Sequence, residues 1–394
     1  MLTGSKELIR DINSHLVLET IVNNGPVSRA DLSKMLGLTK ATISSLVQLL
    51  IEEGLVIEIG SAQTEKGRKP ILLDLNQREG HVISLDLGVD TITVLTCDLR
   101  GTHCRLRQYP NNAKEQGILQ LLVEIIRKTL DELPPVTCGI AGISIGLHGV
   151  VHENQTVFTP YYSLGGVDLT ARLQEIFDIP VFMENEANLS VLGERTFSFN
   201  YPNMINISVH SGIGLGILID DKLYTGKNGY AGEFGHTIVV PKGRPCPCGN
   251  LGCIEQYASE RAILRDLSLK KGRRISLEEF IRLYNLQDVE ALAAIEDFIL
   301  YMGIAINNIL NTFNPDAIVI NSSFTIYLKG ITERLYASLQ NRMDKYCTLL
   351  PSGLQDTAIL LGGACVVIKH FLGIEKLSLS PPADASLLPQ KREF

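Results

Sequence analysis

The segment from His236 to Cys253, HTIVVPKGRPCPCGNLGC, decides how the rest of this sequence is interpreted. It offers one imidazole and three thiols within a short length of chain. Four such ligands form a closed tetrahedral site, which suits zinc and leaves no position open for catalysis. We therefore predict a structural Zn²⁺ ion bound by His236, Cys246, Cys248 and Cys253. Buried free cysteines are the alternative interpretation of the same pattern.

Carboxylates flank this segment on both sides. Glu233 lies three residues before His236, and Glu255 lies two residues after Cys253, so one ion would fix both acidic segments. Carboxylates accept paired hydrogen bonds from the vicinal hydroxyls of sugars, and such a site requires rigid support. The pattern predicts a carbohydrate site. A surface salt bridge is the alternative for either glutamate taken alone.

The composition is that of an ordinary globular protein. Its 394 residues, 45% apolar and 20% charged, exclude a small disulfide scaffold and extended disorder. Glu7 and Asp11 stand where a secretory leader would be apolar. No stretch approaches the run of about 18 uncharged apolar residues that is needed to span a lipid bilayer. We therefore expect a cytoplasmic protein without a membrane partner. The net charge of −7 is uneven, because residues 1–78 contain nine Lys/Arg and nine Asp/Glu, whereas the remainder contains 27 and 34.

Short β-branched runs alternate with helical stretches after residue 78, where the hydrophobic pattern changes. Predicted strands are 81–87, 91–99, 138–145, 204–210, 215–219 and 317–320, and predicted helices are 117–130 and 289–312. This alternation is typical of an α/β fold. We expect two lobes, 79–195 and 196–376, with a ligand cleft between them, and a loosely held tail at 377–394.

The first 78 residues carry a helix-turn-helix pattern. Ser28 predicts the start of a helix that Gly37 ends, and Thr39 caps a second helix. The apolar residues of the second helix are Ile43, Leu46 and Leu50. An earlier helix is expected to complete the core of this head through Ile9, Ile12, Leu16 and Ile21.

A polar loop at 60–69, between predicted strands 55–59 and 70–75, ends in three cations and predicts a wing. We expect the second helix to enter the major groove, and the wing to follow the DNA backbone or reach a minor groove. The predicted DNA-binding residues are Arg29, Thr39, Lys40, Thr42, Ser44, Ser45, Gln48, Lys66, Arg68 and Lys69. A protein-docking or purely structural head is the alternative.

These motifs together resemble the ROK family, which joins sugar-responsive bacterial repressors with sugar kinases. The resemblance rests on Glu233-Phe-Gly-His236, CPCGNLGC and Glu255, with support from Asp86-Leu-Gly88, Gly146-Leu-His-Gly149, Glu184–Asn188 and Gly212–Gly216. It implies a winged helix-turn-helix joined to a two-lobed, actin-like (ribonuclease-H-like) ATPase-type body. It also implies zinc on the four ligands above and a sugar surrounded by Asn185, Glu186, Glu233, His236 and Glu255.

Three positions depart from the pattern of the family's kinases. Val89 stands where the kinases carry a second glycine that lets the backbone approach phosphate. Glu186 stands at the position of the catalytic aspartate, and its extra methylene displaces the carboxylate by roughly 1 Å. Asn321-Ser322-Ser323 replaces a glycine run on the nucleotide side. We therefore expect no enzymatic activity, and an active sugar kinase with a DNA-binding head is the alternative.

The expected function is that of a sugar-responsive transcriptional repressor. Sugar binding would change lobe closure and the spacing of the heads in a homodimer or higher homo-oligomer, so that operator DNA is released. The sequence Asn185-Glu-Ala-Asn188 resembles the xylose-repressor branch more than the glucose or N-acetylglucosamine branches, which favours xylose as the monosaccharide. His148 is either a sugar ligand or a solvent-facing loop residue.

Overall fold

The structure is a computed structural model that describes residues 6–61, 70–113, 117–162, 167–339, 345 and 347–382. Two compact units divide these residues between them. Unit 1 contains the described parts of Met1–His148, Asn154–Glu184 and Gly363–Leu387, and unit 2 contains Gly149–Glu153 and the described part of Asn185–Gly362.

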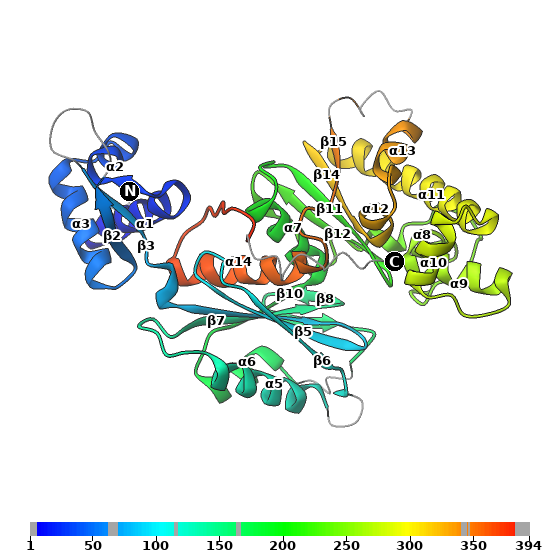
Figure 1. The fold of residues 1–394 in the computed structure, drawn as a ribbon, viewed down its shortest axis with the longest axis horizontal. Coiled ribbons are helices and arrows are strands. Elements are labelled where there is room, and N and C mark those ends of the chain that lie inside the picture. The colour runs from blue at the N-terminus through cyan, green and yellow to red at the C-terminus, as the bar shows by residue number, and fades with distance from the viewer. Residues whose placement is uncertain are drawn as a thin grey trace. The chain divides into compact units, whose positions relative to one another are not determined.

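The head at the start of unit 1 has the predicted helix-turn-helix (Figure 1). Its helices are α1 (Lys6–Asn24), α2 (Arg29–Leu36) and α3 (Lys40–Glu52), and its antiparallel sheet has the order β1 (Val27–Ser28), β3 (Ile71–Leu75), β2 (Val56–Ser61). Ser28 Oγ accepts from the amide of Asp31 at 3.2 Å, which confirms the predicted N-cap. Gly37 ends α2 with φ of 66°, and Thr39 Oγ1 caps α3.

The core of the head differs from the sequence prediction in α1. Ile9, Ile12 and Leu16 are exposed, by 53%, 51% and 44%, so the prediction that they complete the core is wrong. Ile21 is buried as predicted, together with Val17, Leu18 and Val22. The buried apolar side chains lie on the C-terminal half of α1, and α2, α3 and β3 are the elements of the head that pack against this helix.

The body part of unit 1 is a five-stranded mixed sheet with the order β10-β7-β4-β5-β6. The strands are β4 (His81–Leu87), β5 (Thr91–Asp98), β6 (Arg105–Pro110), β7 (Ile140–Leu147) and β10 (Val181–Asn185). Helices α5 (Ile118–Glu132) and α6 (Leu169–Phe177) cover one face, and α14 (Ala358–Leu372) lies on the other (Figure 1). The short strands β8 (Val150–His152) and β9 (Gln155–Phe158) form a hairpin. The predicted strands of this lobe are confirmed within two residues at their ends.

Unit 2 contains a second five-stranded sheet, of order β13-β12-β11-β14-β15. Its strands are β11 (Met204–Val209), β12 (Ile213–Ile219), β13 (Lys222–Leu223), β14 (Ala317–Ser322) and β15 (Thr348–Pro351). Its helices are α7 (Glu186–Phe197), α8 (Glu255–Ala258), α9 (Glu260–Lys271), α10 (Leu277–Asn285), α11 (Val289–Phe313), α12 (Ser323–Tyr327) and α13 (Ile331–Ser338). Phe280, Phe298 and Phe324 are fully buried and in ring contact in its core. The predicted elements at 204–210, 215–219, 289–312 and 317–320 are confirmed.

The end of the chain returns to unit 1, and the boundary between the units falls inside α14. Apart from the short segment Gly149–Glu153, the chain enters unit 2 after Glu184, whereas the predicted lobe boundary at residue 195 lies within α7. Leu377 is only 7% exposed, and the amide of Ser378 donates to Asn23 Oδ1 at 2.8 Å. The prediction of a loosely held tail is therefore wrong at its first residues, because they are packed and hydrogen-bonded.

The segment Gln355–Leu372 is long and apolar enough to cross a membrane. However, 67% of it is buried inside the fold. Core helices of globular proteins share this composition, so the segment is explained by its packing.

Candidate metal centre, sugar site and DNA-binding surface

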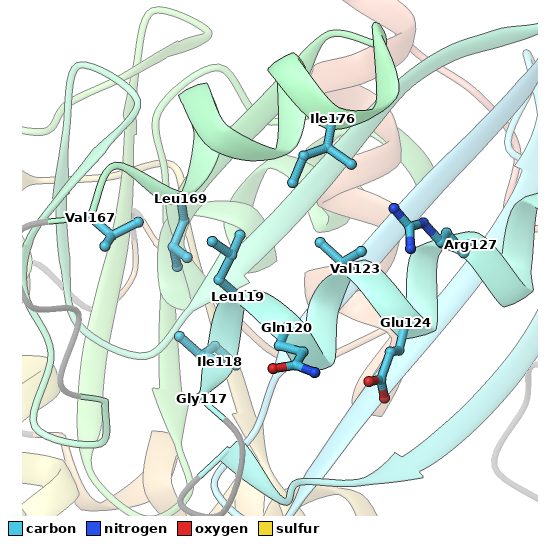
Figure 2. A pocket seen from close by; sticks show the side chains of 10 residues that line it. All are labelled: Gly117, Ile118, Leu119, Gln120, Val123, Glu124, Arg127, Val167, Leu169 and Ile176. Carbon is cyan, nitrogen blue, oxygen red and sulfur yellow. The ribbon is translucent and has the colours of Figure 1, made fainter.

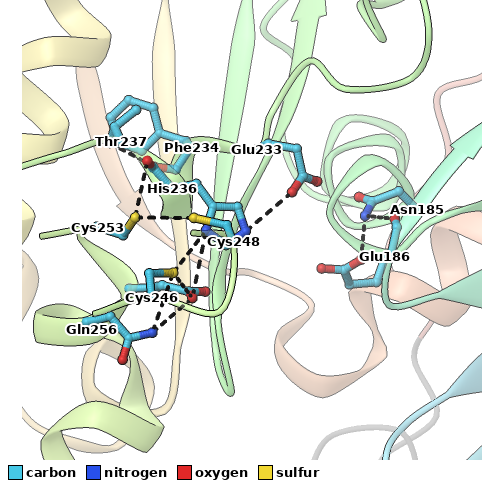
Figure 3. Close-up of polar contacts among 12 residues, drawn as sticks. Asn185, Glu186, Glu233, Phe234, His236, Thr237, Cys246, Cys248, Cys253 and Gln256 are labelled. Carbon is cyan, nitrogen blue, oxygen red and sulfur yellow. Dashed lines mark hydrogen bonds and ion pairs between the residues drawn. The ribbon is translucent and has the colours of Figure 1, made fainter. Parts of the chain in front are cut away.

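The four predicted metal ligands come together in unit 2 (Figure 3). Ligand atoms of His236, Cys246, Cys248 and Cys253 all lie within 4.8 Å of one another. Cys248 Sγ lies 3.6 Å from Cys253 Sγ, and Cys246 Sγ lies 3.5 Å from His236 Nδ1. Tetrahedral zinc with ordinary bond lengths separates two sulfurs by about 3.8 Å and a sulfur from a nitrogen by about 3.6 Å. The group therefore has the size and the donor chemistry of a zinc site.

Tight backbone turns bring the thiols together. Gly252 has φ of +90°, and a Cβ atom there would lie 1.7 Å from the carbonyl oxygen of Val240. Only glycine fits this position. The amide of Cys246 donates to Asn250 O at 2.9 Å, and a β-bridge joins Ile238 to Cys253. The loop is thus closed by its own backbone around the ligands.

Cys246 is a buried ligand with polar neighbours. Burial raises the pKa of its thiol well above the ordinary value, so a bound cation would have to displace a proton from it. Gln256 Nε2 donates to Cys246 Sγ at 3.7 Å and to Glu255 Oε1 at 3.1 Å. Sequence reasoning missed Gln256, and its only signal is its position next to Glu255.

His236 joins the metal group to the predicted sugar carboxylates. Its Nδ1 faces Cys246, while its Nε2 lies 3.7 Å from Glu233 Oε2. The same Nδ1 lies 3.8 Å from Glu255 Oε1. A metal-bound imidazole commonly points its second nitrogen at a carboxylate, which fixes both groups. One ring can therefore contribute to both predicted sites.

Asn185 and Glu186 lie where β10 ends and α7 begins. Asn185 Oδ1 accepts from the amides of Ala187 and Asn188, at 2.8 and 3.1 Å, and thus caps α7. Its Nδ2 donates to Gly149 O at 2.8 Å and to Glu186 Oε2 at 2.6 Å. The Asn185 amide is therefore engaged by the fold, and it holds the Glu186 carboxylate in place.

Two of the predicted sugar carboxylates lie close to the segment Gly212–Gly214, where β12 begins. A Cβ atom at Gly212 would lie 3.2 Å from Glu255 Oε2, and one at Gly214 would lie 3.4 Å from Glu186 Oε1. Gly214 lies in β12, and Gly212 directly precedes this strand. Glu186 and Glu255 therefore lie close to the same short segment, Gly212–Gly214, and Figure 3 shows Glu233 between the metal group and Asn185.

The predicted nucleotide side is occupied by an internal carboxylate. Glu260 accepts from the amide of Ser323 at 2.6 Å, from Ser323 Oγ at 3.2 Å and from Ser322 Oγ at 3.1 Å. Its residue is 8% exposed, and burial raises its pKa above the ordinary value. The groups that replace the kinase glycine run are thus bonded within the protein, which adds to the predicted loss of nucleotide binding. No local pattern in the sequence signals Glu260.

We expect the Glu260→Gln variant to gain stability relative to the wild type as pH rises. The folded state binds the Glu260 proton more tightly than the unfolded chain, so this group favours folding in acid. That contribution is lost as pH rises from the ordinary value of 4.5 through the raised folded pKa, and glutamine does not titrate. Urea unfolding of both proteins, at pH values from 4.5 up through the raised folded pKa, measures the difference in their free energies of unfolding. A difference that stays constant with pH would show that Glu260 has no raised pKa.

His148 lies against Asp86 in unit 1, with its Nε2 3.1 Å from Asp86 Oδ1. Its ring also meets Tyr161 edge-on, with centroids 6.4 Å apart. The interpretation of His148 as a solvent-facing loop residue is wrong, because its side chain is only 19% exposed. Val89, in contrast, is 43% exposed.

The exposed face of α3 has the predicted polarity. Lys40, Ser44, Ser45 and Gln48 are exposed, and the apolar residues Ile43, Leu46 and Leu50 are buried on the opposite side. Thr39 and Thr42 bond to each other at 2.9 Å, and Gln48 Nε2 donates to Glu52. Arg29 on α2 pairs with Glu58 at 2.9 Å. Lys66, Arg68 and Lys69 lie outside the described residues.

A separate hollow of about 510 Å³ lies between α5 and α6 (Figure 2). Its lining residues are Gly117, Ile118, Leu119, Gln120, Val123, Glu124, Arg127, Val167, Leu169 and Ile176. None of the predicted site residues is among them.

Comparison with known sequences identifies the body. The sequence profile of the ROK family matches residues 82–370, which is more than half of the chain. The chain belongs to the ROK family. The profile of the MarR family matches residues 11–66, which covers the helix-turn-helix of this ROK protein. The predicted combination of a winged helix-turn-helix with an actin-like, sugar-kinase-type body is confirmed.

Relatives that match most of this ROK protein are transcriptional regulators, and several are named repressors. The xylose repressor of Bacillus spizizenii is 39% identical over 382 residues, covering 95% of this chain and 99% of its own. The dual regulator NagC of Escherichia coli is 29% identical over 336 residues, covering 82% of this chain and 83% of its own. One similar crystal structure is that of a ROK transcriptional regulator described as a homolog of the Escherichia coli MLC protein. It superposes with a TM-score of 0.77 at 26% identity, covering 92% of this chain and 96% of its own.

ROK kinases resemble the body in fold alone. A glucokinase from Streptomyces griseus has a TM-score of 0.63 at 23% identity, over 73% of this chain and 99% of its own. The relatives that match this chain over most of its length are thus ROK repressors rather than kinases, in agreement with the prediction that the chain is not a sugar kinase.

Proposed function

We propose that this ROK protein is a repressor that binds operator DNA until xylose occupies a zinc-supported site in unit 2. The juxtaposition of Glu186 and Glu255 along Gly212–Gly214, beside the metal group, carries the proposal. Repressors named for xylose, at 39% and 38% identity over nearly the whole chain, support the choice of sugar. Cytoplasmic location follows from this role.

The metal in this proposal is a structural Zn²⁺ held by His236, Cys246, Cys248 and Cys253. Bound zinc supplies a closed four-ligand anchor and takes no part in a reaction. With Nδ1 on the metal side, His236 directs its other nitrogen at Glu233. The ion also fixes the loop that leads into Glu255, since Cys253 lies two residues before it. Zinc would therefore orient two sugar carboxylates at once.

Sugar recognition rests on three carboxylates in this proposal. Glu186, Glu233 and Glu255 accept hydrogen bonds from sugar hydroxyls, and charge-assisted bonds of this kind are strong and directional. Asn185 acts through Glu186, because its amide already donates to that side chain. His236 contributes its Nε2 edge next to Glu233.

DNA recognition in this proposal belongs to α3 and the wing. The exposed residues of α3 meet base edges in the major groove, while Lys40 and the cations Lys66, Arg68 and Lys69 meet phosphate. A homodimer would present two heads to two half-sites. The expected partners are thus operator DNA, the monosaccharide and a second copy of the chain.

Titration calorimetry with xylose, glucose and N-acetylglucosamine tests the proposal. We expect xylose to bind, and to weaken binding to a DNA duplex that the wild-type protein selects from random sequences. Loss of one charged hydrogen-bond acceptor costs about 1.5–3 kcal/mol. Glu233→Gln should therefore bind xylose roughly ten- to 150-fold more weakly.

Glu333→Gln on α13 is the matched control, because Glu333 is exposed and lies outside the predicted site. It should bind xylose like the wild type. Folded wild-type protein that binds none of the three sugars, or that stays on DNA when xylose is bound, would contradict the proposal.

A further inference from the structure

An extended strap after α14 is bonded to the first helix of the DNA-binding head. We define the strap as residues 374–378. Glu19 Oε2 accepts from the amides of Glu375 and Lys376, at 2.8 and 2.9 Å. Asn23 Oδ1 accepts from the amide of Ser378 at 2.8 Å, and Asn23 Nδ2 donates to Lys376 O at 2.9 Å. Two side chains of α1, one turn apart, therefore hold the backbone of the strap.

The strap is joined firmly to α14. Gly373 has φ of +63° and ends the helix, with the amide of Ile374 donating to Lys369 O at 3.1 Å. A Cβ atom on Gly373 would lie 3.0 Å from His15 Nε2 of α1. Ile374 and Leu377 are 5% and 7% exposed. Motion of the end of α14 would therefore be passed to α1 without a flexible joint.

The other end of α14 packs against the helix that carries Glu186. A Cβ atom on Gly193 of α7 would lie 2.4 Å from Ala358 O, and one on Gly362 of α14 would lie 1.8 Å from Leu189 O. The two helix backbones are thus in direct contact within unit 2. Glu186 is the first residue of α7, so a displacement of its carboxylate moves a helix that α14 must follow.

The head has a second attachment that can serve as a pivot. Arg100, in the turn after β5, forms an ion pair with Asp74 of β3. Its guanidinium also donates to Val22 O at 3.3 Å, close to the end of α1. The head is therefore held at Arg100 and at the strap, and a shift of one attachment relative to the other would tilt it.

From these contacts we infer that the strap is the link through which sugar binding reaches the DNA-binding head. The inference rests on the proposed function and adds its route: the sugar moves α7, α7 moves α14, and the strap moves α1 through Glu19 and Asn23. A tilt of α1 carries α3 with it, because the two helices pack together in the core of the head. Paired half-sites tolerate little change in the spacing of two recognition helices, so DNA is released.

The double variant Glu19→Ala/Asn23→Ala tests this route in the full-length protein. We expect it to bind xylose, and the selected duplex without sugar, within about threefold of the wild type. Xylose should no longer release the DNA, so a coupling that is typically about 5- to 150-fold in allosteric proteins should fall to nearly one. Calorimetry gives the sugar affinity, and fluorescence anisotropy gives the DNA affinity with and without xylose.

Lys376→Ala is the matched control, because the strap is held through the Lys376 backbone and not through its side chain. It should keep full coupling. Ser378→Pro removes the amide N–H that donates to Asn23 Oδ1. Like the double variant, it should weaken the coupling between xylose binding and DNA release. Full coupling in the double variant, loss of coupling in Lys376→Ala, or a double variant that cannot bind DNA would each overturn the inference.

Amide hydrogen exchange separates this inference from the proposed function. In the wild-type protein, we expect xylose to change the exchange rates of the amides of Glu375, Lys376 and Ser378, because the hydrogen bonds of these amides carry the displacement from α14 to α1. If these exchange rates do not change although calorimetry shows that xylose is bound, the inference about the strap is wrong, and the proposed repressor function still stands. Absence of sugar binding would instead defeat the proposed function.

Discussion

The Cys253→Ser variant is expected to lose its metal ion, much of its stability and its response to sugar. Wild-type protein should contain about one zinc per chain, and structural zinc sites contribute on the order of 10 kcal/mol in small metal-dependent domains. Even a small part of that free energy exceeds the effect of an ordinary substitution, so the melting temperature should fall by roughly 10 °C. Metal analysis, thermal unfolding and xylose calorimetry measure the three losses.

Cys138→Ser is the matched control, since Cys138 is a free thiol in unit 1 and outside the metal group. It should keep zinc and sugar binding. The result that opposes the zinc proposal is a metal-free wild-type protein with full xylose affinity. In that case Glu233 and Glu255 would be held by the loop backbone alone.

The Ser45→Glu variant is expected to lose operator binding by at least roughly 100-fold. Ser45 is exposed on α3 beside Ser44, so a new carboxylate there would enter the groove next to the phosphates. Xylose affinity and thermal stability should not change, because the buried face of α3 is untouched. Fluorescence anisotropy with the selected duplex measures the loss.

Ala293→Glu supplies the control, because it adds the same charge on an exposed position of α11 in the body. Its DNA affinity should match that of the wild type. Lys40→Ala should weaken binding more modestly and lower the slope of log affinity against log salt by about 1. If Ser45→Glu binds the duplex normally, α3 is not the recognition helix.

The candidate sites differ in how much of them the sequence contained. Three of the four metal ligands lie within one short loop, so their spacing alone predicted the group that the structure brings together. The caps at Ser28 and Thr39 are equally local and were equally predictable. Glu260 was missed because its partners, Ser322 and Ser323, lie more than sixty residues away along the chain.

Side-chain polarity also fails to reveal partners that use the backbone. Asn185 was predicted to bind sugar, yet its amide holds Glu186, Gly149 and the first turn of α7. Helical periodicity identified α1 but assigned three of its apolar residues to a core that covers only the C-terminal half of that helix. Which half is covered depends on how α2, α3 and β3 pack against it.

The sequence by itself determined the elements of this protein, the metal group and the helix-turn-helix, because their signals are spacings, caps and periodicities within a few turns of chain. Only the tertiary structure decided that the last helix returns to unit 1 and that the strap lies on α1. Residues more than 350 positions apart meet there, and the strap contributes backbone groups that nearly every residue carries. A contact made by the backbone leaves no mark in the residue types, so it becomes visible only when the chain is folded.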